Sequence, residues 1–323
     1  MLQSTQSRVP FAPAPMLAVF AAFATLPFWI KGIGLYPYLG VEVMIWVVYA
    51  LGFNLLLGYA GLPSFGHGAY FGIGAYAFGL AQLHWGLGLW GSLFAAVAAG
   101  GIAGALVAGF ISHRRGIYYA LLTIAFGQIF WTVAIKWHSV TRGEDGLLNI
   151  KRGEVFGFSL DRLESLYWFC FAIFVFVVLF LWRLVHSPFG RVLAAIKQNE
   201  TRARFVGYNV WLYKWLAFTL SALVAGVAGG LFALAQQSAY PNVMSLHQSG
   251  FVVMMVLVGG GLVSFWGPVL GAVLFFMARD LLGAYTEAWL LWYGLLFMLI
   301  VLFKPEGLAG LFRRGPVRSQ AAA

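Results

Sequence analysis

Long apolar segments alternate with short polar ones along almost the whole chain. Each apolar segment is close to the roughly 20 residues that an α-helix needs to cross the hydrocarbon core of a bilayer. The pattern therefore predicts an all-α polytopic membrane protein with about ten transmembrane helices, forming one domain over 14–304 with polar tails at 1–13 and 305–323. The predicted helices lie at 14–30, 41–59, 64–83, 88–110, 116–137, 165–185, 214–237, 250–265, 268–283 and 287–304.

The charged residues orient these segments. Short loops rich in Lys and Arg beside apolar segments remain in the cytoplasm, which places Arg114, Arg115 and the polar insert 186–214 inside. The loop 138–164 carries mixed charge with five acids, so we place it outside, in the periplasm. The basic C-terminal tail belongs inside. Ten crossings with the N-terminus and the C-terminus both cytoplasmic satisfy all these constraints.

Composition narrows the function classes. The chain is 62% hydrophobic and 9% charged, which excludes an ordinary soluble domain. The net charge of +10 would suit a nucleic-acid partner, but the excess lies in loops and tails beside apolar segments, so nucleic-acid binding is disfavoured. No Gly-Lys pair occurs anywhere in the sequence, so the chain has no Walker A loop with which to bind and hydrolyse ATP.

Candidate chemistry inside the apolar segments is sparse. A proton- or sodium-driven carrier would bury more acids at mid-membrane, so this class is less favoured. The histidines show no metal-ligand spacing and no nucleophile–base pair is visible, which disfavours a metal site and an intramembrane enzyme. Arg279 and Asp280 are neighbours and could neutralise one another. The ionisable residues within predicted helices are Glu42, Lys136, Arg183, Arg279 and Asp280.

Glycine is dense within the predicted helices. Small residues let helices approach closely in lipid, and they also permit the broken helices that line transport pathways. The cluster Gly58–Gly74 stands out because Pro63 and polar residues accompany it. His67 could bridge a helix break or contact a solute, and Asn54 could join helices or line a pathway; both alternatives remain open.

A short sequence echo links two distant regions. Gly61-Leu62-x-Ser64-Phe65 recurs 200 residues later as Gly261-Leu262-x-Ser264-Phe265. Repeats are common in transporters, but four matches in a Gly-rich chain can also arise by chance.

The hydrophilic insert Ser187–Lys214 carries five basic residues against one acid, Glu200. Ser187 and Pro188 form a favourable helix start, and Gly207 offers a natural end. Four apolar residues would then share one helical face: Val192, Ile196, Ala203 and Val206. The insert is therefore an ordered cytoplasmic element, which either contacts a soluble partner or lies as a basic amphipathic helix on anionic lipid.

Two motifs in the Gly-rich region carry a family resemblance. Asn54–Gly61 reads NLLLGYAG and Ser64–Tyr76 reads SFGHGAYFGIGAY. Together they resemble the signature of LivM-type permeases, the membrane subunits of branched-chain amino acid ABC importers. Further matches extend over about 35–312 and include Arg115–Ala120, Ser187–Arg191, Gly259–Gly261 and Pro305–Gly310.

The resemblance implies a multisubunit importer in the bacterial inner (plasma) membrane. A second, LivH-like permease subunit would complete the translocation pathway in the lipid bilayer. Two ABC ATPase subunits would dock inside, and a periplasmic solute-binding protein would deliver the solute outside. ATP would be used by the partner subunits, and the chain itself would need no cofactor.

Three groups of site residues follow. We expect Gly61–Ala75 and Gly259–Gly271 to line the translocation path, with the candidates Asn54, Gly61, Ser64, His67, Gly74, Gly260 and Gly261. Candidates for coupling to the ATPase are Arg191, Glu200, Ala203 and Gly207. Candidates for docking the binding protein are Arg142, Glu144 and Asp145.

Departures from the family pattern bear on the solute. Relatives usually read G-Q-x-S-L-G where this chain has Gly61–Gly66. Leu62 replaces the polar amide and Pro63 follows it, which could reshape the lining of the path. Arg142 interrupts a common T-G-G-x-D-G and suggests altered docking or an altered solute. The apolar lining favours a branched-chain or other apolar amino acid. Urea or short amides, and aromatic acids, are the alternatives within the family.

Overall fold

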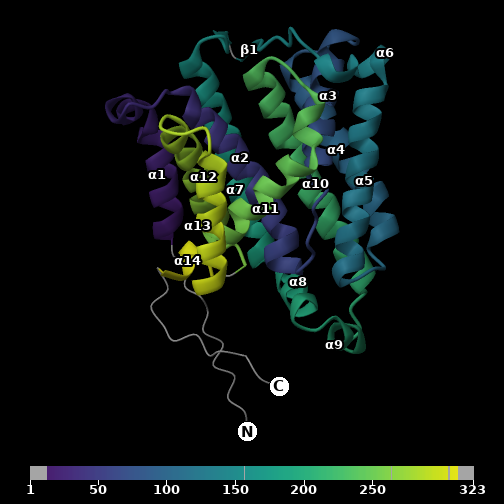
Figure 1. Ribbon diagram of the computed structural model, residues 1–323. Helices are drawn as coiled ribbons and strands as arrows, with labels where there is room; N and C mark the ends of the chain where they lie inside the picture. The colour runs from purple at the N-terminus through teal and green to yellow at the C-terminus, as the bar shows by residue number, and fades with distance from the viewer. Residues whose placement is uncertain (1–12, 156, 263, 305, 312–323) are drawn as a thin grey trace.

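The computed structural model describes residues 13–155, 157–262, 264–304 and 306–311. The protein is a helical bundle (Figure 1), and each of the ten predicted segments overlaps one long helix. The all-α class is thereby confirmed. The long helices are α1 (Pro13–Trp29), α2 (Tyr38–Asn54), α3 (Gly68–Leu83), α4 (Leu89–Ile111), α5 (Gly116–Lys136), α7 (Leu163–His186), α10 (Val210–Gln236), α11 (Leu246–Gly259), α12 (Gly267–Gly283) and α13 (Trp289–Phe303).

Within the described residues, five helical segments are long and apolar enough to cross a membrane. They are Tyr38–Ala60, Leu89–Ile111, Gly116–Lys136, Leu163–His186 and Val210–Gln236. Helices α1, α11 and α13 are apolar but shorter. The fold is thus that of a multi-pass membrane protein. That the chain crosses the membrane ten times remains a prediction. Most of the predicted polar tails, residues 1–12 and 312–323, lies outside the described residues.

The polar connections gather at the two ends of the bundle (Figure 1). One end carries α6 (His138–Thr141), the 3-10 turn η3 (Gly143–Asp145) and a hairpin of β1 (Glu154–Val155) and β2 (Phe158–Ser159). The other carries α8 (Pro188–Gln198), α9 (Glu200–Phe205) and α14 (Leu308–Leu311). The acid-rich loop and the basic insert therefore lie at opposite ends, as their charges predict. Two 3-10 turns, η1 (Ile30–Ile33) and η4 (Pro241–Met244), complete the short elements.

Two groups of helices form the centre of the bundle. In the first, α10 packs against α3 and α4, and α3 and α4 also pack against each other. Glycines allow this closeness: a Cβ on Gly100 would lie 3.0 Å from the Cα of Gly226. In the second, α2 packs with α7, α11 and α12. The two groups meet where α10 lies along α2.

Helix α2 does not end as a regular α-helix. Its last turns, Leu55–Ala60, form a π-helix (η2), and Gly61 ends it with a φ of +69°. The predicted helix at 64–83 begins later than expected, at Gly68, so that 61–67 form a non-helical connection. π-helical turns are rare and concentrate at functional sites, which directs attention to this end of α2.

Candidate functional site

The basic insert folds into two helices rather than one. Pro188 occupies the first turn of α8, as predicted, but the Ser187 hydroxyl donates to the Leu184 carbonyl, 2.6 Å away, and does not cap the helix. At Asn199 the backbone becomes extended, and its side chain accepts a hydrogen bond from the Arg202 N–H at 2.9 Å. This N-cap starts α9 in a new direction.

The break changes which residues form the apolar inner face. Val192, Ile196 and Ala203 are buried together, as predicted. Val206 was expected to join them but is 71% exposed, and Val210 from the start of α10 takes its place. Gly207 ends α9 with a φ of +98°, a conformation that disfavours other residues. The exposed tip of the insert therefore carries Val206 beside Phe205, which is 87% exposed.

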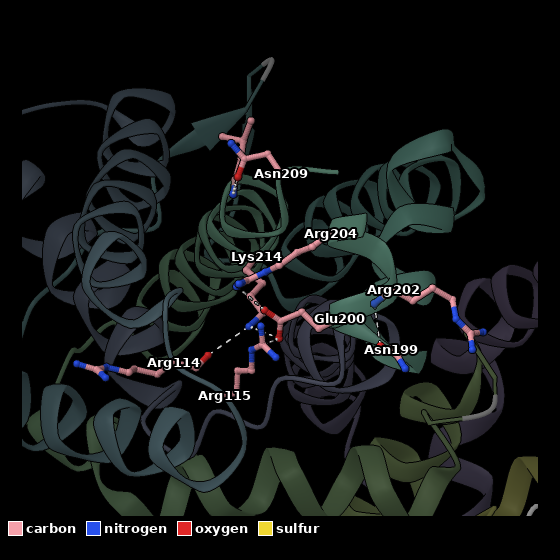
Figure 2. Close-up of polar contacts among 9 residues, drawn as sticks. Arg114, Arg115, Asn199, Glu200, Arg202, Arg204, Asn209 and Lys214 are labelled. Carbon is pink, nitrogen blue, oxygen red and sulfur yellow. Dashed lines mark hydrogen bonds and ion pairs between the residues drawn. The ribbon is translucent and has the colours of Figure 1, made fainter. Parts of the chain in front are cut away.

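Glu200 lies at the centre of a charge cluster (Figure 2). Its carboxylate is 2.9 Å from the Nε of Arg115, 2.9 Å from the Nζ of Lys214 and 3.1 Å from Arg204. Lys214 is 1% exposed and also donates to the carbonyl of Arg114 at 3.2 Å. Glu200 thus ties α9 to the start of α5 and the start of α10. Arg191, in contrast, is exposed on α8.

Lys197, near the end of α8, reaches in another direction. Its ammonium donates to the carbonyl of Gly58 at 2.7 Å and to the carbonyl of Leu262 at 3.3 Å. Its aliphatic stem covers Gly61, where a Cβ would lie 2.9 Å from the Lys197 Cγ. Desolvation of the ammonium lowers the pKa of Lys197 from its ordinary value. A cavity of about 190 Å³ is lined by Lys197 together with Glu200 and Lys214.

Three of the predicted path residues meet at this end of α2. Asn54 is buried, and its side-chain amide has no hydrogen-bond partner among the described residues. A Cβ on Gly261 would lie 2.6 Å from the Asn54 Oδ1, and a Cβ on Gly58 would lie 2.6 Å from the Gly261 carbonyl. Asn54, Gly261 and Gly61, together with Lys197, therefore occupy one neighbourhood.

The non-helical connection 61–67 is held between α5 and α11. The Phe65 N–H donates to the Thr123 hydroxyl at 3.1 Å, and Gly66 packs so tightly on the Thr123 carbonyl that a Cβ would collide with it. The Gly68 N–H donates to the hydroxyl of Ser249 at 2.9 Å. Ser64 is fully buried, and its hydroxyl has no partner within the described residues.

His67 lies inside the helix bundle. Its ring stacks on Tyr49, with centroids 5.8 Å apart and planes 11° from parallel. Its Nε2 is 3.0 Å from the Ser221 hydroxyl, which itself donates to the Gly52 carbonyl at 2.7 Å. Because that hydroxyl proton is used, Nε2 donates and Nδ1 carries the lone pair. These contacts join α2, α3 and α10, which matches the structural role left open for this residue.

The other predicted path residues lie in helix contacts. A Cβ on Gly74 would lie 2.6 Å from the Gly226 carbonyl, in the interface of α3 and α10. Gly260 ends α11 with a φ of +89° and packs on the backbone of Glu306 and Gly307. The left-handed residue is Gly61 in one copy of the sequence echo and Gly260, not Gly261, in the other. The two copies therefore do not repeat the same backbone in register.

The predicted docking residues occupy the far end of the bundle. Arg142, Glu144 and Asp145 are exposed, whereas Gly143 between them and Thr141 and Gly146 on either side are buried. The Thr141 hydroxyl donates to the carbonyl of Ala134 at 2.7 Å, which anchors this loop to α5. The loop thus presents three charged side chains on a fixed backbone.

Comparisons with known proteins show the family of the chain. The family of the branched-chain amino acid transport system permease component matches residues 37–304. The protein belongs to this family. The high-affinity branched-chain amino acid transport system permease LivM of Salmonella typhimurium is 31% identical over 84% of this chain and 69% of its own length.

Two further LivM proteins are similar to this permease. The LivM of Escherichia coli is 30% identical with the same coverage of both chains. The probable branched-chain amino acid transport permease LivM of Methanocaldococcus jannaschii is 23% identical over 82% of this chain and 90% of its own length. No solved structure matches the permease.

Arg279 of the permease has one more charged partner than its sequence neighbour Asp280. Arg279 on α12 does bond Asp280, at 2.9 Å, but it also forms two bonds of 2.7 and 2.8 Å with the carboxylate of Glu42 on α2. The interpretation that Arg279 and Asp280 neutralise one another is therefore incomplete. A bidentate pair of this kind is strong and directional, and it fastens α12 to α2.

Sequence reasoning missed the inward roles of Lys197, Lys214 and Arg115 in this permease. Lys197 and Lys214 were counted only among the basic residues of the insert, and Arg115 only as a residue that orients a loop and begins a family match. Nothing local in the sequence reveals the partners of Lys214 and Arg115. For Lys197 there was a signal in Pro63, which stands five positions after Gly58 and cannot donate to its carbonyl.

Proposed function

We propose that this permease is the membrane subunit of an ABC importer that carries a branched-chain amino acid across the bacterial inner membrane. A second, LivH-like permease completes the translocation path, a periplasmic solute-binding protein delivers the amino acid, and two ABC ATPase subunits bind and hydrolyse the ATP. The observation that carries the proposal is the α8–α9 element, whose inner face packs on the bundle while its tip presents Phe205 and Val206.

The α8–α9 element is the contact for the ATPases. An amphipathic helix pair with exposed apolar residues fits a groove on a soluble partner. Arg191 lies on its exposed surface, and Ala203 packs it against the bundle. Glu200 fixes α9 to α5 and α10, and Gly207 lets the chain turn back into α10.

The two ends of the bundle then face opposite sides of the membrane. The α8–α9 end lies in the cytoplasm with both termini, and ten helices cross the bilayer. At the periplasmic end, the exposed Arg142, Glu144 and Asp145 meet the binding protein. A loop that is anchored by buried residues and displays both signs of charge suits selective docking.

The translocation path runs beside the broken end of α2. Asn54, Gly61, Ser64, Gly260 and Gly261 lie at or beside the two breaks, where the side chains of Asn54 and Ser64 have no hydrogen-bond partner among the described residues. His67 and Gly74 shape the path by holding the surrounding helices together.

The decisive experiment is uptake by vesicles that contain the permease with its partner subunits. We expect ATP-dependent uptake of leucine, isoleucine or valine that needs the binding protein and persists when proton and sodium gradients are collapsed. Uptake of urea or of aromatic acids in preference to these would reassign the solute. Uptake that continues without ATP and stops with the ion gradient would identify a secondary carrier and refute the proposal.

A further inference from the structure

The carbonyl of Gly58 lacks a backbone donor because of the local sequence. In a π-helix, a carbonyl accepts from the N–H five residues later, and five residues after Gly58 stands Pro63, which has none. The N–H groups of Gly61 and Leu62, which could also approach, both donate to the carbonyl of Leu56. An external donor is therefore needed at the point where α2 breaks.

Lys197 is that donor. Its ammonium is 2.7 Å from the Gly58 carbonyl and 3.3 Å from the Leu262 carbonyl, and its stem lies on Gly61. Gly58 belongs to the end of α2, and Leu262 belongs to the turn between α11 and α12. One side chain from α8 thus holds both broken segments: its stem contacts Gly61 in the first copy of the sequence echo, and its ammonium bonds Leu262 in the second.

The second attachment of the α8–α9 element goes elsewhere. Glu200 bonds Arg115 at the start of α5 and Lys214 at the start of α10 (Figure 2). Helix α10 belongs to the group with α3 and α4, whereas α2, α11 and α12 belong to the other group. The element is consequently fastened to each group of helices by a different side chain, three residues apart.

We propose that Lys197 is a positioning residue that transmits the displacement of α8 to the broken ends of α2 and the α11–α12 turn. Glu200 holds α9 to the group of α10, so a rotation of the element moves the two groups relative to each other at the path. This inference rests on the proposed function, because it assigns the residue through which the ATPases act on the path.

The test compares the complete importer, reconstituted in vesicles, with Lys197→Met and with Lys197→Arg. Lys304→Met is the matched control, since it makes the same change in an exposed lysine after α13. The readout is solute taken up per ATP hydrolysed, normalised to assembled complexes. We expect Lys197→Met to lower this ratio roughly tenfold, the scale of a lost hydrogen bond to a charged group. ATP hydrolysis should continue.

Lys197→Arg should restore most of the ratio, because a guanidinium can also donate to two carbonyls. A purely structural role would lower uptake and hydrolysis together and leave their ratio unchanged. That outcome, or a ratio for Lys197→Met equal to that of Lys304→Met, overturns the inference. Failure of the unmodified importer to couple ATP hydrolysis to uptake would instead reject the proposed function.

Discussion

Replacing Glu200 with glutamine should lower the free energy of unfolding of the permease far more than a substitution at an exposed residue of the insert would. The substitution removes the charge that balances Lys214, whose side chain is 1% exposed. Removing one partner of a buried ion pair typically costs 3–5 kcal/mol. Glu200 is itself 13% exposed and Lys214 keeps the Arg114 carbonyl, so we expect a loss near the lower limit, about 3 kcal/mol.

Two companion variants separate this effect from a general loss of charge. Arg204 also bonds Glu200 but is 51% exposed, so Arg204→Gln should cost about 0.3–0.5 kcal/mol, as exposed helix pairs do. The double variant Glu200→Gln with Lys214→Met removes both members of the buried pair. It should be more stable than Glu200→Gln alone, with a coupling energy of about 1–3 kcal/mol.

The assay is equilibrium unfolding of the purified permease in mixed detergent micelles, followed by tryptophan fluorescence, with the free energy of unfolding compared across the variants. The reasoning predicts the order of losses Glu200→Gln, then the double variant, then Arg204→Gln. Equal losses for Glu200→Gln and Arg204→Gln would refute it, because the cost would then not depend on the buried ammonium.

Three further substitutions probe the neighbouring contacts. Gly66→Ala places a methyl group against the Thr123 carbonyl and should cost about 1–3 kcal/mol in the same unfolding assay. His67→Phe loses one hydrogen bond, worth about 1 kcal/mol, and should leave the KM for uptake unchanged; a raised KM would place His67 on the path. Gly207→Val forces a β-branched residue to a φ of +98° and should lower uptake per ATP, whereas Gly109→Val, in open space on α4, should not.

The hydrophobic pattern predicted the helices well because helices that face lipid and helices that are buried in protein both consist mainly of apolar residues. Ten segments were placed, and each overlaps a helix. The pattern was wrong where a helix breaks. Val206 has the correct spacing for the inner face of one helix, but Asn199 interrupts that helix, and Val210 is buried in its stead.

The candidate site was less predictable because its contacts join residues that are remote in sequence. Glu200 was singled out from the sequence, but its partner Arg115 lies 85 positions earlier, and no spacing rule connects them. Local geometry was more accessible. The positive φ of Gly61 and Gly207 follows from glycine's freedom at helix ends. That the Gly58 carbonyl lacks a backbone donor could have been deduced from Pro63.

The charges of the insert favour a protein partner over a lipid surface. Binding of anionic lipid by a basic segment typically needs a cluster of 4–8 Lys or Arg side chains. The insert has five, but Lys214 and Arg204 are bonded to Glu200 and Lys197 is bonded to carbonyls. Arg191 and Arg202 are the two that remain, and among the described residues neither side chain forms an ion pair. Two cations without an ion pair are too few for lipid adhesion, and the exposed apolar tip suits a groove with a defined shape.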